Sequence, residues 1–390
     1  MPTASLCLVH PSRADGKAPA VRLAVCAAGE IWGGVERFIV TLATGLRYLG
    51  IDPLVVLFYD APLAAALREQ RIAVVTLDGF GKYDPRTVTQ LRGLLREHQI
   101  NVLHVHGYRA SIVGCLAARH LGIKIVKTEH GQVEPLSGWR AVLSHGRLIA
   151  NTLLERLANL CTLDAQVFVS TDIQQRLRLP ARIPQRVIYN GIDAAALRTD
   201  AAPARRSRSD TPFDVGIVGR IDQVKGHEVL LRALACLRHL PRLRVHVFGT
   251  GPLEAHCRRM AAEGKLSDVV RFHGFDPAIH ERMASLDLLV MPSLHEGLPY
   301  VLLEAMSLRV PIVASRVGGL REVLDDGSGM LVPLGDPYAL ATAIERLYDD
   351  RELRARLAAR AHETVRQRFA ARDMVRAYCD LYRQLLVPAS

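Results

Sequence analysis

The sequence predicts an α/β protein that contains two doubly wound parallel sheets in tandem. Short apolar runs alternate with segments of helical periodicity along most of the 390 residues. The alternation stops after Asn190 and Gly191, and residues 199–212 are polar, basic and contain proline, as expected of a linker. A second alternating series then begins. This pattern is typical of two Rossmann-like units.

The first series begins with the apolar run 21–29 (VRLAVCAAG), which is predicted to be a strand. The next segment carries apolar residues that share one face of a helix, at positions 35, 38, 39, 42, 46 and 49. Further strands are predicted at 53–59, 72–77, 101–106, 123–128, 166–170 and 186–190, with helices at 85–98 and 109–121.

The second series has the same character. Its predicted strands are 214–220, 243–249, 269–275, 286–292 and 310–317, and its helices are 226–240, 252–264, 278–285 and one from about 300. The tail is helical from 337 to 386 with breaks. We therefore expect a mobile leader at 1–20, a first domain at 21–195, a linker at 196–212, a second domain at 213–370 and a terminal helix at 371–390 that crosses back to the first domain.

Composition excludes several protein classes. No run approaches the roughly 20 apolar residues that cross a bilayer, and the first 20 residues lack the order of a signal peptide. The seven cysteines are odd in number, scattered and without a C-x-x-C pair. They predict neither a disulfide framework nor a cysteine-based metal site, and they favour a cytoplasmic location.

The positive charge is unevenly distributed. The net charge is +11, of which residues 1–199 carry +8 and the remainder +3. Such a field attracts an anionic membrane surface, a phosphorylated acceptor or nucleic acid. A generally arginine-rich composition explains it equally well.

The most informative motif is LHEGLPYVLLE at 294–304, which follows an apolar strand. If Pro299 opens a helix, backbone N–H groups of the turn point at an anion, while Glu304 faces the same cleft as Glu296. Ligands of open α/β sheets bind at this end of the strands. The arrangement suits a sugar nucleotide.

The second motif is GRIDQVKGH at 219–227. Arg220 leaves the end of a strand and Lys225 precedes a helix, so both cations are expected to converge at one carboxyl edge. A diphosphate is the ligand that this pair suits.

Histidines and glycines complete the set of candidate residues. His104 and His106 alternate at a strand end, which places both on one face with His106 nearer the cleft, and His130 ends another strand. Gly33 and Gly34 lie between a predicted strand and a predicted helix, where they either let a phosphate approach the backbone or serve only the tight turn. The first βα turn lacks G-x-G-x-x-G, which disfavours a dinucleotide site.

In their order, these motifs resemble the family 4 retaining glycosyltransferases of the GT-B fold, two Rossmann-like domains facing across a cleft. The similarity runs through GGVERFIVTLATGL, HVHGYRAS, TEHG, VSTDIQQRL, VIYNGID, VGRIDQVKGHEVLLRAL, VFGTGPLE, VRFHGF and HEGLPYVLLEAM. Many bacterial polysaccharide and glycolipid glycosyltransferases belong to that group. The resemblance implies that the second domain binds the nucleotide sugar and the first faces the acceptor.

The resemblance also implies roles for individual residues. Arg220 and Lys225 would hold the donor diphosphate, Glu296 would bind hydroxyls of the donor sugar, and His106 would lie beside the reacting sugar. The remaining implied contacts are Glu304 with the ribose, Gly34 with the diphosphate, the amides of Gly297, Leu298, Pro299 and Tyr300 with sugar and phosphate, and Gly249, Gly251, Gly274 and Phe275 around the base and phosphates.

No cofactor and no metal are expected. The implied donor is a UDP- or GDP-sugar, and the sequence contains no D-x-D triplet. Retention is inferred from the family alone, since no residue can be assigned as a covalent nucleophile.

The acceptor is expected to be a saccharide or a lipid-linked molecule. Residues 137–160, with Trp139 and several leucines broadly to one side, have the period of an amphipathic helix, which either contacts an anionic membrane or covers a core. His130 and Trp139 are the acceptor-side candidates. The location that follows is cytoplasmic, with peripheral contact at the inner face of the membrane.

Three alternatives make different predictions. A sugar-nucleotide epimerase of similar architecture would alter the donor without an acceptor. A nicotinamide-dependent dehydrogenase needs the glycine fingerprint that is missing. A basic nucleic-acid-binding protein would bind oligonucleotides with steep salt dependence, and no nucleic-acid partner is expected if the glycosyltransferase interpretation holds.

Overall fold

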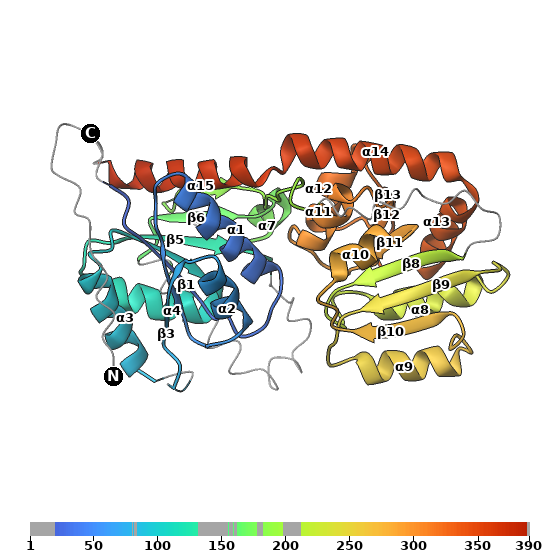
Figure 1. Cartoon of the computed structure of the whole chain (residues 1–390), viewed down its shortest axis with the longest axis horizontal. Coiled ribbons are helices and arrows are strands. Elements are labelled where there is room, and N and C mark those ends of the chain that lie inside the picture. Colours follow the sequence, from blue (N-terminus) through green and yellow to red (C-terminus); the bar gives the residue numbers. More distant parts are fainter. Residues whose placement is uncertain are drawn as a thin grey trace.

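The computed structural model describes residues 20–79, 81, 84–131, 155, 159, 162–177, 182–197 and 212–387. These residues form two parallel sheets, one of seven strands and one of six, which lie side by side with helices packed around them (Figure 1). The predicted α/β class with two doubly wound sheets is confirmed. The predicted leader up to residue 19, most of the predicted linker and nearly all of the 137–160 helix lie outside the described residues.

The first sheet has the order β3-β2-β1-β4-β5-β6-β7. The order reverses between β1 and β4, which makes this pair the topological switch point. Its strands are β1 (Leu23–Ala27), β2 (Leu54–Leu57), β3 (Ala73–Thr76), β4 (Val102–His106), β5 (Lys124–Glu129), β6 (Ala165–Phe168) and β7 (Gln185–Val187). Its described helices are α1 (Gly34–Tyr48), α2 (Pro62–Glu69), α3 (Arg86–Glu97), α4 (Gly107–Ala118) and α7 (Thr171–Leu177).

The second sheet has the order β10-β9-β8-β11-β12-β13, with its switch point between β8 and β11. Its strands are β8 (Phe213–Val218), β9 (Leu243–Phe248), β10 (Val270–Gly274), β11 (Leu288–Met291), β12 (Ile312–Ser315) and β13 (Met330–Val332). Its helices are α8 (His227–Cys236), α9 (Glu254–Glu263), α10 (Ile279–Ala284), α11 (Tyr300–Ser307), α12 (Gly318–Leu324) and α13 (Pro337–Asp349).

Two C-terminal helices connect the sheets. Helix α14 (Arg351–Arg368) runs along the second sheet and α15 (Ala371–Leu386) continues along the first (Figure 1). Between the two helices, Ile192 donates its N–H to Phe369 O at 2.8 Å and accepts from Ala371 N at 3.0 Å. A Cβ at Gly191 would lie 2.8 Å from Ala370 O, so the Asn190-Gly191 turn needs a glycine for this close approach.

Helix α15 completes the core of the first domain. Its apolar face packs against α1, and a Cβ at Gly45 of α1 would lie 2.5 Å from Val375. Tyr378 and Tyr382 are fully buried. The Tyr382 hydroxyl lies 2.7 Å from Nδ1 of His104, which belongs to β4. The side-chain hydroxyl therefore ties the last helix to β4.

Four elements are not among those that the sequence pattern predicts: α2, α7, α12 and the strand β13. Each is short, at three to eight residues, and too brief for a period to stand out from its flanks. Helix α2 does begin with Pro62, a recognised first-turn residue.

Candidate active site

Glu296 is the centre of a polar cluster at the carboxyl end of β11. Its carboxylate is buried and accepts hydrogen bonds from Ser293 Oγ at 2.8 Å and from Lys225 Nζ at 2.6 Å. Lys225 comes from the loop after β8, the neighbour of β11 at the switch point. A buried carboxylate requires this neutralisation, because leaving it unpaired would cost several kcal/mol, about 3 or more.

The glycine turn after Glu296 is held between the two domains. A Cβ at Gly297 would lie 2.5 Å from His130 O of the first domain. His295 Nε2 lies 3.0 Å from Gly131 O, and the Asn190 side-chain amide donates to Leu298 O at 2.7 Å. The turn thus touches the backbone of His130 and Gly131 and the side chain of Asn190, and only a glycine fits at position 297.

Helix α11 starts at Tyr300 with Pro299 as its N-cap, as the motif predicts. Glu304, 2% exposed, lies inside this helix and forms an ion pair with Arg37 of α1. Arg37 Nη1 also donates to His280 Nε2 at 2.9 Å. Burial, with a smaller effect of Arg37, lowers the pKa of His280 to about 4, so this imidazole is neutral and accepts the hydrogen bond.

Of the two cations in GRIDQVKGH, only Lys225 reaches Glu296. The Arg220 side chain is 58% exposed, and its Nε lies 4.0 Å from Asp222. At that exposure the contact with Asp222 stabilises little. Arg220 is therefore free to turn toward a ligand at the carboxyl edge of β8.

Three glycines shape the loops beside Arg220. Gly249 and Gly274 have φ of +130° and +72°, and Gly249 N donates to Gly274 O at 2.7 Å. A Cβ at Gly251 would collide with Ile221 O. These glycines have a packing role that requires no ligand. Phe275, which follows them, is 68% exposed.

The three histidines lie together near the carboxyl ends of two neighbouring strands of the first sheet: His104 and His106 in β4, and His130 directly after β5. His106 Nδ1 is 3.0 Å from His130 Nε2, and His104 Nε2 is 2.7 Å from Thr128 Oγ1. Burial lowers the pKa of His104 to about 3 and, against the opposing effect of Glu129, that of His130 to about 4, so both rings are neutral at pH 7. His106 Nε2 is buried and has no partner among the described residues, which leaves one ring nitrogen for a ligand.

Gly33 and Gly34 form the turn into α1. Gly33 is the N-cap in extended backbone, and a Cβ at Gly34 would lie 3.8 Å from the Tyr300 ring across the domain boundary. Burial raises the pKa of Glu36, although its carboxylate accepts backbone hydrogen bonds at the start of the helix. Gly34 therefore lies close to helix α11 of the second sheet, and the Glu36 carboxylate is two residues further along α1.

Some predicted features lie outside the described residues or are absent from them. Trp139 belongs to the part of the chain that is not described. Within the described ranges, no three His, Cys, Asp or Glu side chains cluster in a way that suits a metal ion. None of the helices in that same part of the chain has both the length and the apolar character needed to cross a bilayer.

The sequence analysis did not predict three residues that contact Glu296 or Glu304: Ser293 at Glu296, and Arg37 and His280 at Glu304. Arg37 is one turn beyond the double glycine, and this proximity is the only signal that could have indicated it. His280 is a single histidine in a short polar helix, and Ser293 resembles any residue that ends a strand. The roles of Arg37 and His280 depend on contacts between segments far apart in the sequence.

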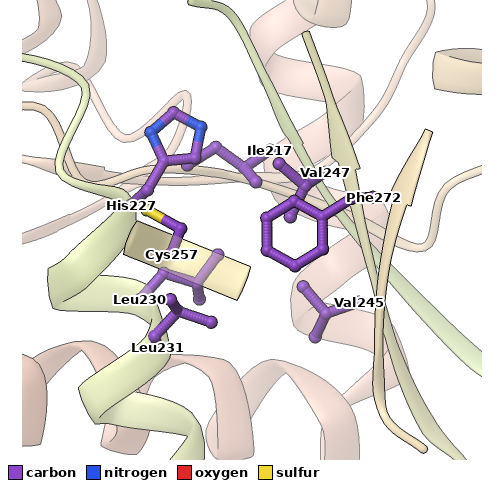
Figure 2. Close-up of a pocket in the computed structure, with 8 residues that line it drawn as sticks. All are labelled: Ile217, His227, Leu230, Leu231, Val245, Val247, Cys257 and Phe272. Atoms are coloured by element: carbon purple, nitrogen blue, oxygen red, sulfur yellow. The ribbon is translucent and has the colours of Figure 1, made fainter. Parts of the chain in front are cut away.

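A small cavity lies inside the second domain, away from Glu296. It is lined by apolar side chains together with Cys257 and His227, which begins α8 (Figure 2). Both ring nitrogens of His227 are buried and without a partner among the described residues, and burial is the main cause that lowers its pKa to about 4. The cavity is almost entirely apolar, so it suits packing rather than nucleotide binding.

Comparison with known sequences and structures identifies the family. The sequence family "Glycosyl transferases group 1" matches residues 199–364, and "Glycosyltransferase Family 4" matches residues 32–196. A D-inositol 3-phosphate glycosyltransferase of Saccharomonospora viridis is 31% identical over 314 residues, 73% of this chain and 70% of the relative. The lipopolysaccharide core biosynthesis glycosyltransferase LpsE of Rhizobium meliloti is 34% identical over 180 residues, 45% of this chain and about half of the relative, 52%.

Solved structures show the same fold. Anabaena HepE in complex with UDP-glucose superposes with a TM-score of 0.82 at 22% identity, over 94% of this chain and 100% of that chain. Sucrose-phosphate synthase from Thermosynechococcus elongatus has a TM-score of 0.77 at 22% identity, over 94% and 99% of the two chains. The chain therefore belongs to the group 1, family 4 glycosyltransferases, hexosyltransferase enzymes with the GT-B fold.

Proposed function

We propose that the protein transfers a sugar from a UDP- or GDP-sugar to a saccharide or lipid-linked acceptor, with retention of anomeric configuration, in cell-surface polysaccharide or glycolipid synthesis. The observation that carries the proposal is the Lys225–Glu296 pair at the switch point of the second sheet. The name of LpsE, a lipopolysaccharide core enzyme, supports the process, and the UDP-glucose complex of HepE supports the donor class.

The proposed donor site uses residues from both domains. Lys225 and Arg220 bind the diphosphate, Glu296 binds the sugar hydroxyls and Glu304 binds the ribose. The first turn of α11, from Tyr300 onward, adds backbone N–H groups, which favour a phosphate. Gly34 closes the site from the first domain, and Gly249, Gly251, Gly274 and Phe275 border the nucleotide.

The proposed chemistry is separation of charge across this cluster. As the glycosidic bond breaks, positive charge develops on the sugar ring and negative charge on the diphosphate. Lys225 and Arg220 stabilise the departing diphosphate, and Lys225 is held in place by Glu296 before the reaction begins. In this proposal, Nε2 of His106, which has no partner among the described residues, binds a hydroxyl of the reacting sugar. Cations of the chain thus supply the charge that a metal ion supplies in other transferases.

We also propose the division into domains at 21–195 and 213–370, with the helix from 371 returning to the first domain. The proposed location is the cytoplasm, in peripheral contact with the inner membrane face. The basic excess in residues 1–199 supports that contact. Sedimentation with anionic vesicles, compared with neutral ones, tests it.

The test of the activity is a product analysis. A panel of UDP- and GDP-sugars is incubated with lipid-linked and saccharide acceptors, and the products are identified by mass spectrometry. We expect one donor to yield an acceptor carrying one added sugar, and proton NMR to show the anomeric configuration of the donor. Alteration of the donor without any acceptor would instead favour an epimerase.

A further inference from the structure

Arg109 carries a buried positive charge that no carboxylate neutralises among the described residues. Its side chain lies in the first turn of α4, and the residue is 7% exposed. Nη2 donates to Gly81 O at 3.5 Å, and Nε has no partner in the part of the chain that is described. The guanidinium carbon lies 4.3 Å from the ring centroid of Phe58 and 5.5 Å from that of Tyr59.

These contacts place the guanidinium at the carboxyl edge of the first sheet. Phe58 and Tyr59 directly follow β2, Gly81 follows β3, and α4 begins where β4 ends. The switch point between β1 and β4 is at this edge, where open α/β sheets bind ligands.

The surroundings of Arg109 are electrostatically unfavourable for a cation. The N-terminus of α4 has no side-chain cap, and its first turn contains no acidic residue. A helix N-terminus carries partial positive charge, so Arg109 adds like charge to it. Contacts with two aromatic faces offset only part of the cost of burying a guanidinium. An anion bound at this point would neutralise both the helix end and the arginine.

We propose that Arg109 and the N-terminal N–H groups of α4 form a phosphate-binding subsite for the acceptor. The planar guanidinium suits bidentate binding of a phosphate, and the helix end adds backbone donors. His106, the N-cap of the same helix, has a free ring nitrogen three residues away. The subsite would hold an anionic group of the acceptor at the same carboxyl edge of the sheet at which His106 ends β4. The inference deepens the proposed function, because it names the acceptor class.

The test measures phosphate binding apart from the donor site. Glucose 1-phosphate is titrated calorimetrically into the Lys225→Ala variant, in which the proposed diphosphate site is weakened, with and without a second change. We expect Arg109→Gln to weaken binding about 10- to 100-fold. Arg119→Gln, at the exposed end of the same helix, is the matched control and should leave binding unchanged.

A second measurement keeps the proposal testable if Arg109→Gln fails to fold. The melting temperature of the Lys225→Ala variant should rise with inorganic phosphate but not with sodium chloride of equal ionic strength. Vesicles containing a polyprenyl phosphate, tested beside glucose 1-phosphate, distinguish a lipid headgroup from a free sugar phosphate, and binding of either supports the subsite. Absence of binding by both probes, or equal binding by Arg109→Gln and the control, would overturn it. Binding of UDP to the wild-type protein is measured separately, so a failed donor site is recognised independently.

Discussion

The ammonium group of Lys225 lies 2.6 Å from the carboxylate of Glu296, although the two residues are 71 positions apart in the sequence. The first follows β8 and the second follows β11, and these strands are neighbours at the switch point. The residue proposed to bind the diphosphate is therefore held by the residue proposed to bind the sugar. This pair fixes the geometry of the site before the donor arrives.

The first prediction concerns this pair. Lys225→Met should lower turnover by about 10- to 100-fold, because one charge-assisted hydrogen bond to the donor is worth about 1.5–3 kcal/mol. It should also lower the melting temperature, since Glu296 is left buried beside Ser293 alone. Adding Glu296→Gln should restore part of the stability but none of the turnover. Steady-state kinetics and thermal melts of the wild type, the two single variants and the double variant separate the two effects.

Arg232, on the exposed face of α8 and paired with Glu228, is the matched control for that cycle. Arg232→Met should change neither turnover nor stability appreciably. Near-normal transfer by an Arg220→Ala, Lys225→Ala double variant would refute the diphosphate assignment.

The second prediction concerns the bridge from Arg37 to Glu304. Arg37→Gln removes the cation that joins α1 of the first domain to α11 of the second, and it leaves Glu304 buried. We expect the nucleotide-free protein to open, because separation of the domains returns that carboxylate to water. Small-angle X-ray scattering should report a larger radius of gyration. The control is Arg47→Gln, on the same helix but paired at the surface with Asp52, which should scatter as the wild type does. An unchanged radius of gyration for Arg37→Gln would show that the bridge does not hold the domains together.

The third prediction is a loss of stability in mild acid. The pKa of His130 is about 4 in the folded protein, against an ordinary value of 6.5, so below pH 6.5 the unfolded chain takes up a proton that the folded chain does not. Stability is therefore complete above pH 6.5 and declines toward pH 4, by at most about 1.4 kcal/mol per pH unit for this group. Thermal melts between pH 7 and 5 should show a steeper decline for the wild type than for His130→Gln. Parallel slopes for the two proteins would contradict the assignment.

The fourth prediction concerns metal ions. Because the charge on the leaving diphosphate is assigned to Lys225 and Arg220, EDTA should leave the rate of transfer unchanged. Rates measured before and after chelation, with added magnesium as the comparison, test this. Inactivation by EDTA that magnesium reverses would require a different account of the leaving group.

The sequence predicted the fold well because strong signals coincide. Buried parallel strands such as 53–59 and 286–292 read as unbroken apolar runs, and their order along the chain limits the topology. The Glu296 and Glu304 motif was placed correctly on a turn and a helix, since Pro299 and the glycine carry local conformational information. Sequence patterns predict the structure where the conformation of a segment depends mainly on its own residues.

The contacts across the domain boundary could not be predicted in the same way. Glu322 of α12 accepts hydrogen bonds from Thr171 N at 3.1 Å and Asp172 N at 2.6 Å, and so caps a helix of the other domain. Neither segment has a sequence pattern that predicts which other segment it contacts. The same holds for Arg37, whose role depends on how the two sheets face each other. Such pairs follow from tertiary packing and not from periodicity.

The most direct test of the central claim is a crystal structure of the protein with a bound nucleoside diphosphate, chosen as the one that raises the melting temperature most. The account predicts that the phosphates contact Arg220 and Lys225 and that the ribose hydroxyls reach Glu304, with Arg37 displaced. A nucleotide whose phosphates lie away from both cations would contradict it.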